Sequence, residues 1–224
     1  MNKFLLIFTI ISLLFSTSLY SQESEAEDEL YPMRIALTNL LFPQGEPGLN
    51  RIRQAFLSVK RELFIDTNYR SVAYKNMPIP TKGGLIQPAP QMIASILIES
   101  GIQPEDKILI IGQNTRYISS IINELTNNIY VLDPGITNSS GLSYNVKKEL
   151  SYYGWVEEAP FHIIILFGAV EEIPQSLISQ LIINGKIIAP LTYGTGSQIL
   201  TSSIRYTNGF EVQTIGDSYI HRLK

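Results

Sequence analysis

Residues 108–133 read ILIIGQNTRYISSIINELTNNIYVLD. The continuous apolar run at 108–111 is typical of a strand buried on both faces of a parallel sheet. Helical periodicity follows over 117–125, and a second apolar run at 129–132 ends at an aspartate. A strand, a helix and a strand in this order predict a right-handed βαβ unit.

The flanking sequence extends this alternation. Helices are expected at 49–60, 91–100 and 174–182, strands at 162–167 and 185–191, and a hairpin at 197–216 that turns at Asn208-Gly209. The fold class predicted is α/β, a Rossmann-like doubly wound sheet with a C-terminal β-hairpin. Ligands in such sheets bind beyond the carboxyl ends of the strands, so the site is expected at 112–117, 133–135 and 167–172.

Composition excludes several classes of function. The 224 residues suit one α/β domain, and a net charge of -3 without a basic surplus gives no support to nucleic-acid binding. There are no cysteines, so disulfides, thiolate nucleophiles and cysteine metal sites are excluded. The two histidines, His162 and His221, lie far apart in the sequence, and no metal site is expected. We expect a monomer.

The N-terminus, MNKFLLIFTIISLLFSTSLYSQES, has a basic residue followed by an apolar run and then small residues, as a secretory signal peptide does. The run is shorter than the roughly 20 apolar residues of a membrane-spanning helix. Cleavage after Ser18 or after Ser21 fits, and an anchor or a buried helix is the alternative. The organisation predicted is a signal peptide at 1–21, a linker and N-terminal extension at 22–48, and one α/β domain at 49–224. The mature protein is then exported, with no membrane association after cleavage, and is cytoplasmic if the signal prediction is wrong.

Four segments, in order, resemble one known family. The stretch 55–97 (AFLSVKRELF to QMIASIL), the stretch 101–125 (GIQPEDKILIIG to NEL), the stretch 154–191 (GWVEEAPFHIIILF to IIAPL) and the stretch 197–210 are similar to protein-L-isoaspartate O-methyltransferases. The resemblance runs from about residue 51 to residue 210. It implies the fold of class I S-adenosylmethionine-dependent methyltransferases.

The resemblance also implies an activity, a cofactor and a partner. Family members transfer a methyl group from S-adenosylmethionine to the carboxylate of an L-isoaspartyl residue in damaged proteins. The ester then closes to a succinimide, which reopens in part to normal aspartate. The implied partner is a protein or peptide that contains isoaspartyl residues.

The cofactor loop departs from the family pattern. The family has GTGSG where this chain has GQNTR: Gly112 is kept, and Asn114 and Arg116 replace the second and third glycines. Asn114 can still make the turn, because asparagine tolerates unusual backbone angles. Arg116 brings a cation to the place of the methionine part of the cofactor. It indicates either an altered ligand, such as an anion, or a lost cofactor site with Arg116 in solvent.

The acidic residue after the second strand matches the family in kind. Asp133 is placed to accept hydrogen bonds from the cofactor ribose, although an Asp-Pro-Gly turn explains it equally well. The connection over 134–153 is shorter than in the family. It puts Leu150 where the family has an adenine-binding aspartate, and Glu149 stands in only if the register slips by one residue.

The family's active loop has also lost its hydroxyls. Gly84 and Ile86 stand where the resemblance implies a threonine and a serine over the reacting carboxylate, whereas Gln87 is kept. Losing a positioned polar group at a reacting centre typically costs about 10²-fold or more in rate. Lys82 or Thr81 is an alternative source of donors.

Export adds to these departures, because S-adenosylmethionine is a cytosolic metabolite. Two hypotheses follow. The chain is an isoaspartyl methyltransferase that is weakened or inactive, or it is an exported pseudoenzyme that serves as a peptide- or protein-binding scaffold.

Overall fold

The computed structural model describes residues 28–81, 84–136, 138–194 and 196–223. A seven-stranded sheet has the order β5-β4-β3-β6-β7-β8-β9, and a separate two-stranded sheet pairs β1 with β2. The strands are β1 (Ile79–Pro80), β2 (Ile86–Gln87), β3 (Ile108–Gly112), β4 (Ile129–Leu132), β5 (Asn145–Lys147), β6 (Phe161–Phe167), β7 (Leu181–Tyr193), β8 (Ser197–Tyr206) and β9 (Gly209–Asp217).

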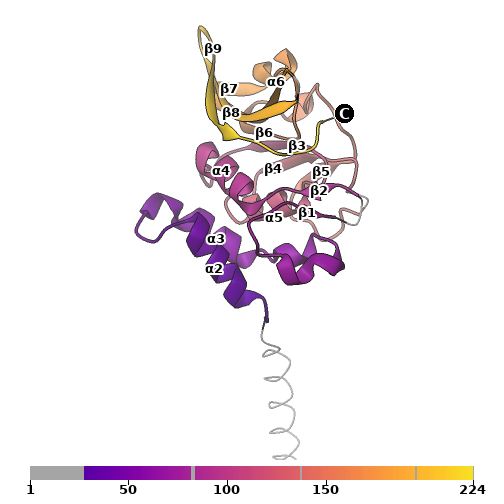
Figure 1. The fold of residues 1–224 in the computed structure, drawn as a ribbon. Helices are drawn as coiled ribbons and strands as arrows, with labels where there is room; N and C mark the ends of the chain where they lie inside the picture. The colour runs from indigo at the N-terminus through magenta and orange to yellow at the C-terminus, as the bar shows by residue number, and fades with distance from the viewer. Residues whose placement is uncertain (1–27, 82–83, 137, 195, 224) are drawn as a thin grey trace, which may run out of the picture.

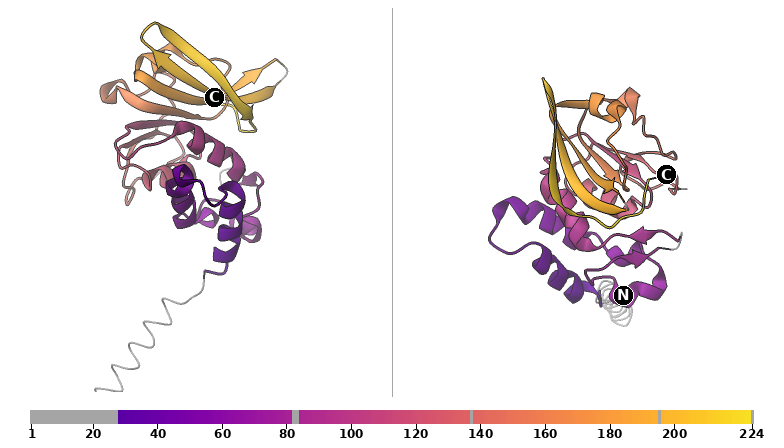
Figure 2. Two further views of the ribbon diagram at one scale, coloured as in Figure 1. Left: turned by 90° about the vertical axis from the view of Figure 1, so that its left-hand side faces the viewer. Right: turned by 45° about the horizontal axis from the view of Figure 1, so that its top comes forward.

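Five α-helices and four short 3₁₀ helices lie among the described residues. The α-helices are α2 (Tyr31–Leu41), α3 (Asn50–Ser58), α4 (Pro90–Ser100), α5 (Arg116–Asn123) and α6 (Gln175–Ser179). The 3₁₀ helices are η1 (Pro47–Leu49), η2 (Arg61–Leu63), η3 (Thr67–Val72) and η4 (Val156–Glu158). Figures 1 and 2 show α2 and α3 at one end of the molecule and the β8–β9 hairpin at the other, with the parallel strands between them.

The strand pairing confirms the predicted sheet. Strands β5, β4, β3, β6 and β7 pair in parallel, and β7, β8 and β9 pair antiparallel. The C-terminal hairpin is therefore confirmed. Its turn lies one residue earlier than predicted, because Tyr206 pairs with Gly209 and leaves Thr207 and Asn208 as the turn.

Apolar side chains of the sheet alternate between two cores. Ile108 and Ile110 of β3 join the larger cluster with α3, α4 and α5, whereas Leu109 and Ile111 join a second cluster on the other face. There the cover comes from α6, from Trp155 and from the C-terminal segment. Helices thus lie on both faces, as a doubly wound sheet requires.

The short connection after β4 explains why one face carries so little helix. Among its described residues, the stretch 133–144 forms turns and no helix, yet β5 still pairs with β4 at the sheet edge. The sequence predicted the shortening. The edge strand is retained and a helix is lost.

Two boundaries differ from expectation. Helix α2 lies inside the predicted extension at 22–48, and Phe42, which follows it, is fully buried against Phe56 with ring centroids 5.0 Å apart. The packed region therefore begins before residue 49. The helix expected at 174–182 ends at Ser179, because the carbonyl of Gln180 already accepts the amide of Phe161 at 2.7 Å and starts β7.

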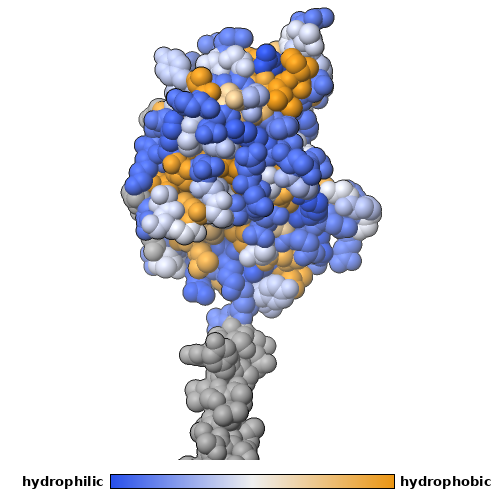
Figure 3. Space-filling model, turned by 180° about the vertical axis from the view of Figure 1, so that it is seen from behind, coloured by the Kyte–Doolittle hydropathy of each residue, from blue (hydrophilic) through white to orange (hydrophobic). Residues whose placement is uncertain are grey.

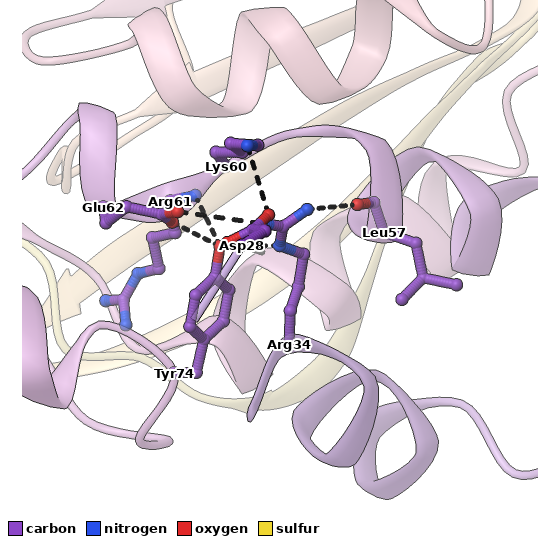
Figure 4. Close-up of polar contacts among 7 residues, drawn as sticks. All are labelled: Asp28, Arg34, Leu57, Lys60, Arg61, Glu62 and Tyr74. Carbon is purple, nitrogen blue, oxygen red and sulfur yellow. Dashed lines mark hydrogen bonds and ion pairs between the residues drawn. The ribbon is translucent and has the colours of Figure 1, made fainter. Parts of the chain in front are cut away.

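A buried polar cluster joins α2 to the segment that precedes the strand-end loops (Figure 4). Arg34 donates to the Tyr74 hydroxyl at 2.8 Å and to the Leu57 carbonyl at 3.0 Å, and it forms an ion pair with Asp28. The Tyr74 hydroxyl in turn donates to Glu62. Because each member has a partner, the cluster holds the start of η2 in place.

Arg61 holds the irregular segment around β1 and β2 by hydrogen bonds to its backbone. It is fully buried, and its guanidinium donates to the carbonyls of Ala73, Met77 and Pro88 at 2.7, 3.1 and 3.0 Å. Burial lowers the pKa of Arg61 to about 10, so the group is still charged at neutral pH. One side chain therefore fixes the irregular segment that contains β1 and β2.

The surface is largely hydrophilic when seen from behind, with several separate apolar patches (Figure 3). Among the described residues, no helix is long and apolar enough to cross a membrane.

Replacing Gly112 by alanine is predicted to destabilise the fold by about 1–3 kcal/mol, as overpacking does. A Cβ at Gly112 would lie 2.5 Å from the Phe167 carbonyl oxygen of β6. Urea unfolding measures the loss. G48A is the matched control, since nothing lies within 4 Å of a Cβ there. Equal stability of the two variants would contradict the packing role.

Candidate functional site

A cleft of about 370 Å³ lies beyond the carboxyl ends of β3 and β4. Leu63, Phe64 and Ile65 form an apolar wall, and Thr81 and Leu85 come from the loop between β1 and β2. The turns after β3 and β4 complete the cleft through Asn114, Arg116, Asp133, Gly135 and Ile136. The cleft lies where the strand order predicts a ligand site.

Gly112 has a structural task. Its Cα faces the backbone of Phe167 so closely that a side chain would collide with the carbonyl and the Cβ of that residue. The glycine lets β3 and β6 approach at the strand end. Its presence is therefore explained by packing, whether or not a cofactor binds.

Asn114 makes the turn that a glycine makes in the family. Its φ is 59°, in the left-handed region that asparagine tolerates better than most residues. Its side-chain amide donates to Oε1 of Gln87 at 3.2 Å. The prediction that Asn114 can still turn is confirmed, and the bond joins the cofactor loop to the β2 strand.

Arg116 is the first residue of α5, and its side chain is exposed and lines the cleft. Among the described residues, its guanidinium makes no hydrogen bond and no ion pair. The structure thus places the cation at the cleft rather than on a remote surface. Both interpretations, an altered ligand and a lost cofactor site, are compatible with this position.

Asp133 is fully buried, and its carboxylate is already bonded. Oδ2 accepts the Thr115 amide and the Thr115 hydroxyl, both at 2.8 Å, and Oδ1 accepts the Gly135 amide at 2.8 Å. The Gly135 bond is the Asp-Pro-Gly turn that the sequence offered as an alternative. The ribose role stays a prediction, and three protein donors compete with it.

Thr115 was missed by the sequence prediction. It precedes the first residue of α5, where threonine commonly caps a helix, but here its hydroxyl donates to Asp133 rather than accepting from the helix. A threonine before a helix was a visible signal. Nothing in the sequence indicated that its partner would be Asp133, which follows the neighbouring strand β4.

Glu149 does not reach the cleft. It is exposed in the irregular stretch after β5, and it is not among the residues that line the cleft. Leu150 packs instead against the second apolar cluster. The register slip that would bring Glu149 to an adenine is therefore not seen in this structure.

The active-loop positions flank Leu85, which lines the cleft, but are not themselves among its lining residues. Gly84 adopts a φ of 75°, and Ile86 is 50% exposed. The hydroxyl of Thr81 donates to the Leu85 carbonyl at 3.0 Å, so it is committed within the loop. Lys82 lies outside the described residues. Gln87 is fully buried, and its Nε2 has no hydrogen-bond partner among the described residues.

The chain's own C-terminal segment lies on the loop after β6. Ala169 donates its amide to the His221 carbonyl at 2.9 Å and accepts the Leu223 amide at 2.9 Å. The Leu223 side chain occupies the space where Gly168 lacks a Cβ. The small residues Gly168 and Ala169 thus make room for residues 221–223.

His221 lies in this C-terminal segment, and its imidazole ring is not hydrogen-bonded within the described structure. Both ring nitrogens are buried and have no hydrogen-bond partner among the described residues. Burial lowers the pKa of His221, and the nearby Asp133 carboxylate opposes that effect. The imidazole is therefore neutral at pH 7. His221 was not predicted as a site residue, because nothing in the sequence ties residue 221 to β4.

No group of three or more histidine, aspartate or glutamate side chains that would suit a metal ion occurs among the described residues. The cofactor that the family binds is S-adenosylmethionine, and the residues that would meet it here are those that line the cleft at the ends of β3 and β4. Asp133 Oδ2 accepts two bonds from Thr115, Oδ1 accepts one from Gly135 and has room for a ribose hydroxyl, and Arg116 lines the same cleft.

The parallel sheet with its strand-end cleft defines a protein of the Rossmann-like methyltransferase class. The family model for protein-L-isoaspartate(D-aspartate) O-methyltransferase matches residues 36–220, and the chain belongs to this family. Members of this family bind S-adenosylmethionine and act on proteins that contain isoaspartyl residues.

Relatives agree with this assignment. A protein-L-isoaspartate O-methyltransferase of Chlorobaculum tepidum is 32% identical over 72% of this chain and 80% of its own length. One from Pectobacterium atrosepticum is 28% identical over 74% of this chain and 83% of its own length.

Solved structures show the same fold. A protein-L-isoaspartate O-methyltransferase structure matches with a TM-score of 0.73 and 18% identity, over 85% of this chain and 66% of that chain. A Plasmodium falciparum structure of this type, in complex with S-adenosyl-L-homocysteine, matches with a TM-score of 0.69 and 18% identity, over 88% and 99% of the two chains.

Replacing Asp133 by asparagine is predicted to lower the free energy of unfolding by about 2–3 kcal/mol. The charge-assisted bonds from Thr115 are weakened, and a buried amide is left facing a donor. Urea unfolding measures the loss. The control E149Q alters an exposed carboxylate and is expected to stay within about 0.5 kcal/mol of the wild type. If D133N loses no more stability than E149Q does, the bonds between Thr115 and Asp133 do not stabilise the fold.

His221 is predicted to make the fold less stable in mild acid. Because its pKa in the folded protein lies below the value of about 6.5 for a free histidine, the folded state binds fewer protons than the unfolded state. Stability is therefore complete above pH 6.5 and falls as the pH drops below it. Unfolding of the wild type and of H221Q, compared between pH 7 and pH 5, checks this. The variant should lose less stability, and parallel losses would contradict the prediction.

Proposed function

We propose that this chain is a protein-L-isoaspartate O-methyltransferase family member in which methyl transfer is weakened or lost. The observation that carries the proposal is the state of Asp133, whose carboxylate is buried and accepts three hydrogen bonds from Thr115 and Gly135. A ribose would have to share this carboxylate, because Oδ2 is filled by the two bonds from Thr115 and Oδ1 already accepts the Gly135 amide.

Charge at the cleft supports the same proposal. Arg116 lines the cleft and has no anionic partner among the described residues. S-adenosylmethionine carries a net positive charge, because its sulfonium and its ammonium outweigh its one carboxylate. Like charges in a partly enclosed cleft repel more strongly than they do in open water, so the arginine disfavours the methyl donor.

The loop that would position the methyl acceptor is weakened as well. Gly84 and Ile86 offer no hydroxyl, and the Thr81 hydroxyl is bonded within its own loop. A reacting carboxylate therefore finds few fixed donors among the described loop residues. Because positioned donors contribute much of the rate in such sites, slow or absent transfer is the expected result.

Export is part of the proposal. The signal peptide proposed at 1–21 lies outside the described residues, and its support is the pattern of a basic start, an apolar run and small residues. An exported protein meets little S-adenosylmethionine, which fits a family member that has lost its donor. The mature protein is then periplasmic or secreted.

A second candidate is an exported scaffold that still recognises peptides. Two apolar side chains favour it, because Leu63 in the cleft wall is 72% exposed and Ile86, next to the cleft residue Leu85, is 50% exposed. Exposed apolar groups beside a cleft are a common means of holding an extended peptide. Both candidates keep the family fold and differ in whether any chemistry is left.

Titration calorimetry of the purified protein with S-adenosylmethionine, and with S-adenosyl-L-homocysteine, which lacks the sulfonium charge, tests the proposal. We expect no binding at concentrations that saturate an active family enzyme run in parallel. The variants R116G and N114G/R116G restore the glycines of the family pattern and should raise the affinity, the double variant most. Wild-type binding equal to that of the active enzyme, with methylation of an isoaspartyl peptide, would overturn the proposal.

A further inference from the structure

Two asparagines of the chain are followed by glycine, at Asn184-Gly185 and at Asn208-Gly209. Glycine has no Cβ to shield its backbone amide, so the amide nitrogen of such a pair can reach the asparagine side chain. Attack of this nitrogen on the side-chain carbon Cγ closes a five-membered succinimide. Because both pairs have the same two residues, a difference in their reactivity has to come mainly from the fold.

The second pair lies in the open. Asn208 is in the turn of the β8–β9 hairpin, and both it and Gly209 are exposed. The hairpin lies at the end of the molecule away from α2 and α3, and β9 is an edge strand of the seven-stranded sheet (Figure 1). Nothing lies within 4 Å of a Cβ placed on Gly209, and the Asn208 side chain has no hydrogen-bond partner among the described residues. Water and base therefore reach both reacting groups.

The backbone of this turn is also weakly held. Gly209 begins β9 and pairs with Tyr206 at the very end of the ladder, where strand pairing opens first. The favoured two-residue hairpin turns need a positive φ at their first residue, which Thr207 does not have. The turn therefore fits the twist of the strands less well than those turns do, and Asn208 can rotate until Cγ faces the Gly209 nitrogen.

The first pair is crowded by the sheet. Asn184 lies within β7 with a φ of 65°, and Gly185 is buried. A Cβ on Gly185 would lie 3.0 Å from the carbonyl oxygens of both His162 and Ile182. From Lys186 onward, β7 pairs with β6 on one side and with β8 on the other. Attack on the Asn184 side chain therefore requires β7 to separate from its neighbours.

We propose that Asn208 is a site of spontaneous modification in the folded protein, where it converts to aspartate and isoaspartate while Asn184 stays intact. The Gly209 nitrogen loses its proton and bonds to Cγ of Asn208, and the Cγ–Nδ2 bond breaks as ammonia leaves with that proton. One water molecule then opens the succinimide at either of its two carbonyls. The step needs no oxidant, reductant or enzyme.

The hairpin can hold either product. Opening at the backbone carbonyl leads the main chain through the former side chain of Asn208, which adds one methylene to the turn and leaves a free carboxylate. Slightly longer hairpin loops are also common, and the exposed turn leaves room for the added carbon. The modified protein is therefore expected to stay folded, with one more negative charge at the tip of the hairpin.

Incubation of the folded protein at mildly alkaline pH, followed by trypsin digestion and mass spectrometry, tests the proposal. The digest contains the peptides 149–186 and 206–222, each with a single asparagine. We expect deamidation of 206–222 to proceed at least about tenfold faster than that of 149–186, which corresponds to about 1.4 kcal/mol of extra opening free energy at β7. In urea, where neither pair is held in a strand, the two rates should become similar.

Variants and an isomer assay assign the reaction. G209A shields the amide without a clash and should slow the conversion of Asn208 severalfold. G216A is the matched control, because it adds the same methyl group to open space in the same strand, and it should leave the rate unchanged. Isoaspartate in 206–222 resists a protease that cleaves before aspartate and accepts a methyl group from an active family enzyme. Both signals should be absent from N208Q.

The proposal is overturned if Asn184 converts as fast as Asn208 in the folded protein, or if G209A converts at the wild-type rate. It is also overturned if Asn208 stays intact over a period in which the synthetic peptide 206–222 converts fully. None of these measurements needs a cofactor bound to this chain, so their outcome is independent of whether methyl transfer is retained.

Discussion

The bond between Asp133 and Thr115 is the constraint on which the site depends. It joins the carboxyl end of β4 to the turn after β3, and so fixes the start of α5 relative to the sheet. The carboxylate is fully buried, and a buried charge is stable only when donors replace its hydration. The backbone amide and hydroxyl of Thr115 and the amide of Gly135 supply them. This buried charge therefore serves the fold.

A second set of bonds holds the opposite wall. Arg61 donates to several backbone carbonyls of the segment that contains β1 and β2, and the cluster of Arg34, Glu62 and Tyr74 fixes Arg61 against α2 (Figure 4). Removing one partner from such a network leaves another buried polar group unsatisfied, which costs more than the bond itself contributes. Both walls are therefore held by polar ties and not by the apolar core alone, and the cleft between them is largely preformed.

The sequence predicted the elements with strong periodicity and missed those whose positions depend on distant partners. The apolar runs at 108–111 and 129–132 gave β3 and β4, and the strand-end rule placed the cleft. Helix α2 was missed because it follows an acidic stretch and buries Arg34, which reads as a surface residue until Asp28 and Tyr74 are seen beside it. The C-terminal segment has no periodicity, and distant partners fix it: Ala169 pairs with it, and the side chains of Tyr152 and Gln198 bond to its backbone.

The kept and the altered motif positions differ in what they contribute to the fold. Gly112 is kept, and packing against Phe167 requires a glycine there. An acidic residue is kept at position 133, and its carboxylate holds Thr115. Arg116 and Ile86 replace a glycine and a hydroxyl residue of the family pattern; both are exposed, and Arg116 lines the cleft without a hydrogen bond or ion pair within the described structure. The kept positions are therefore explained by the fold alone, because overpacking at Gly112 or lost donors at Asp133 would destabilise it. The fold needs neither Arg116 nor Ile86, so what these two residues do must be tested by ligand binding and not by stability.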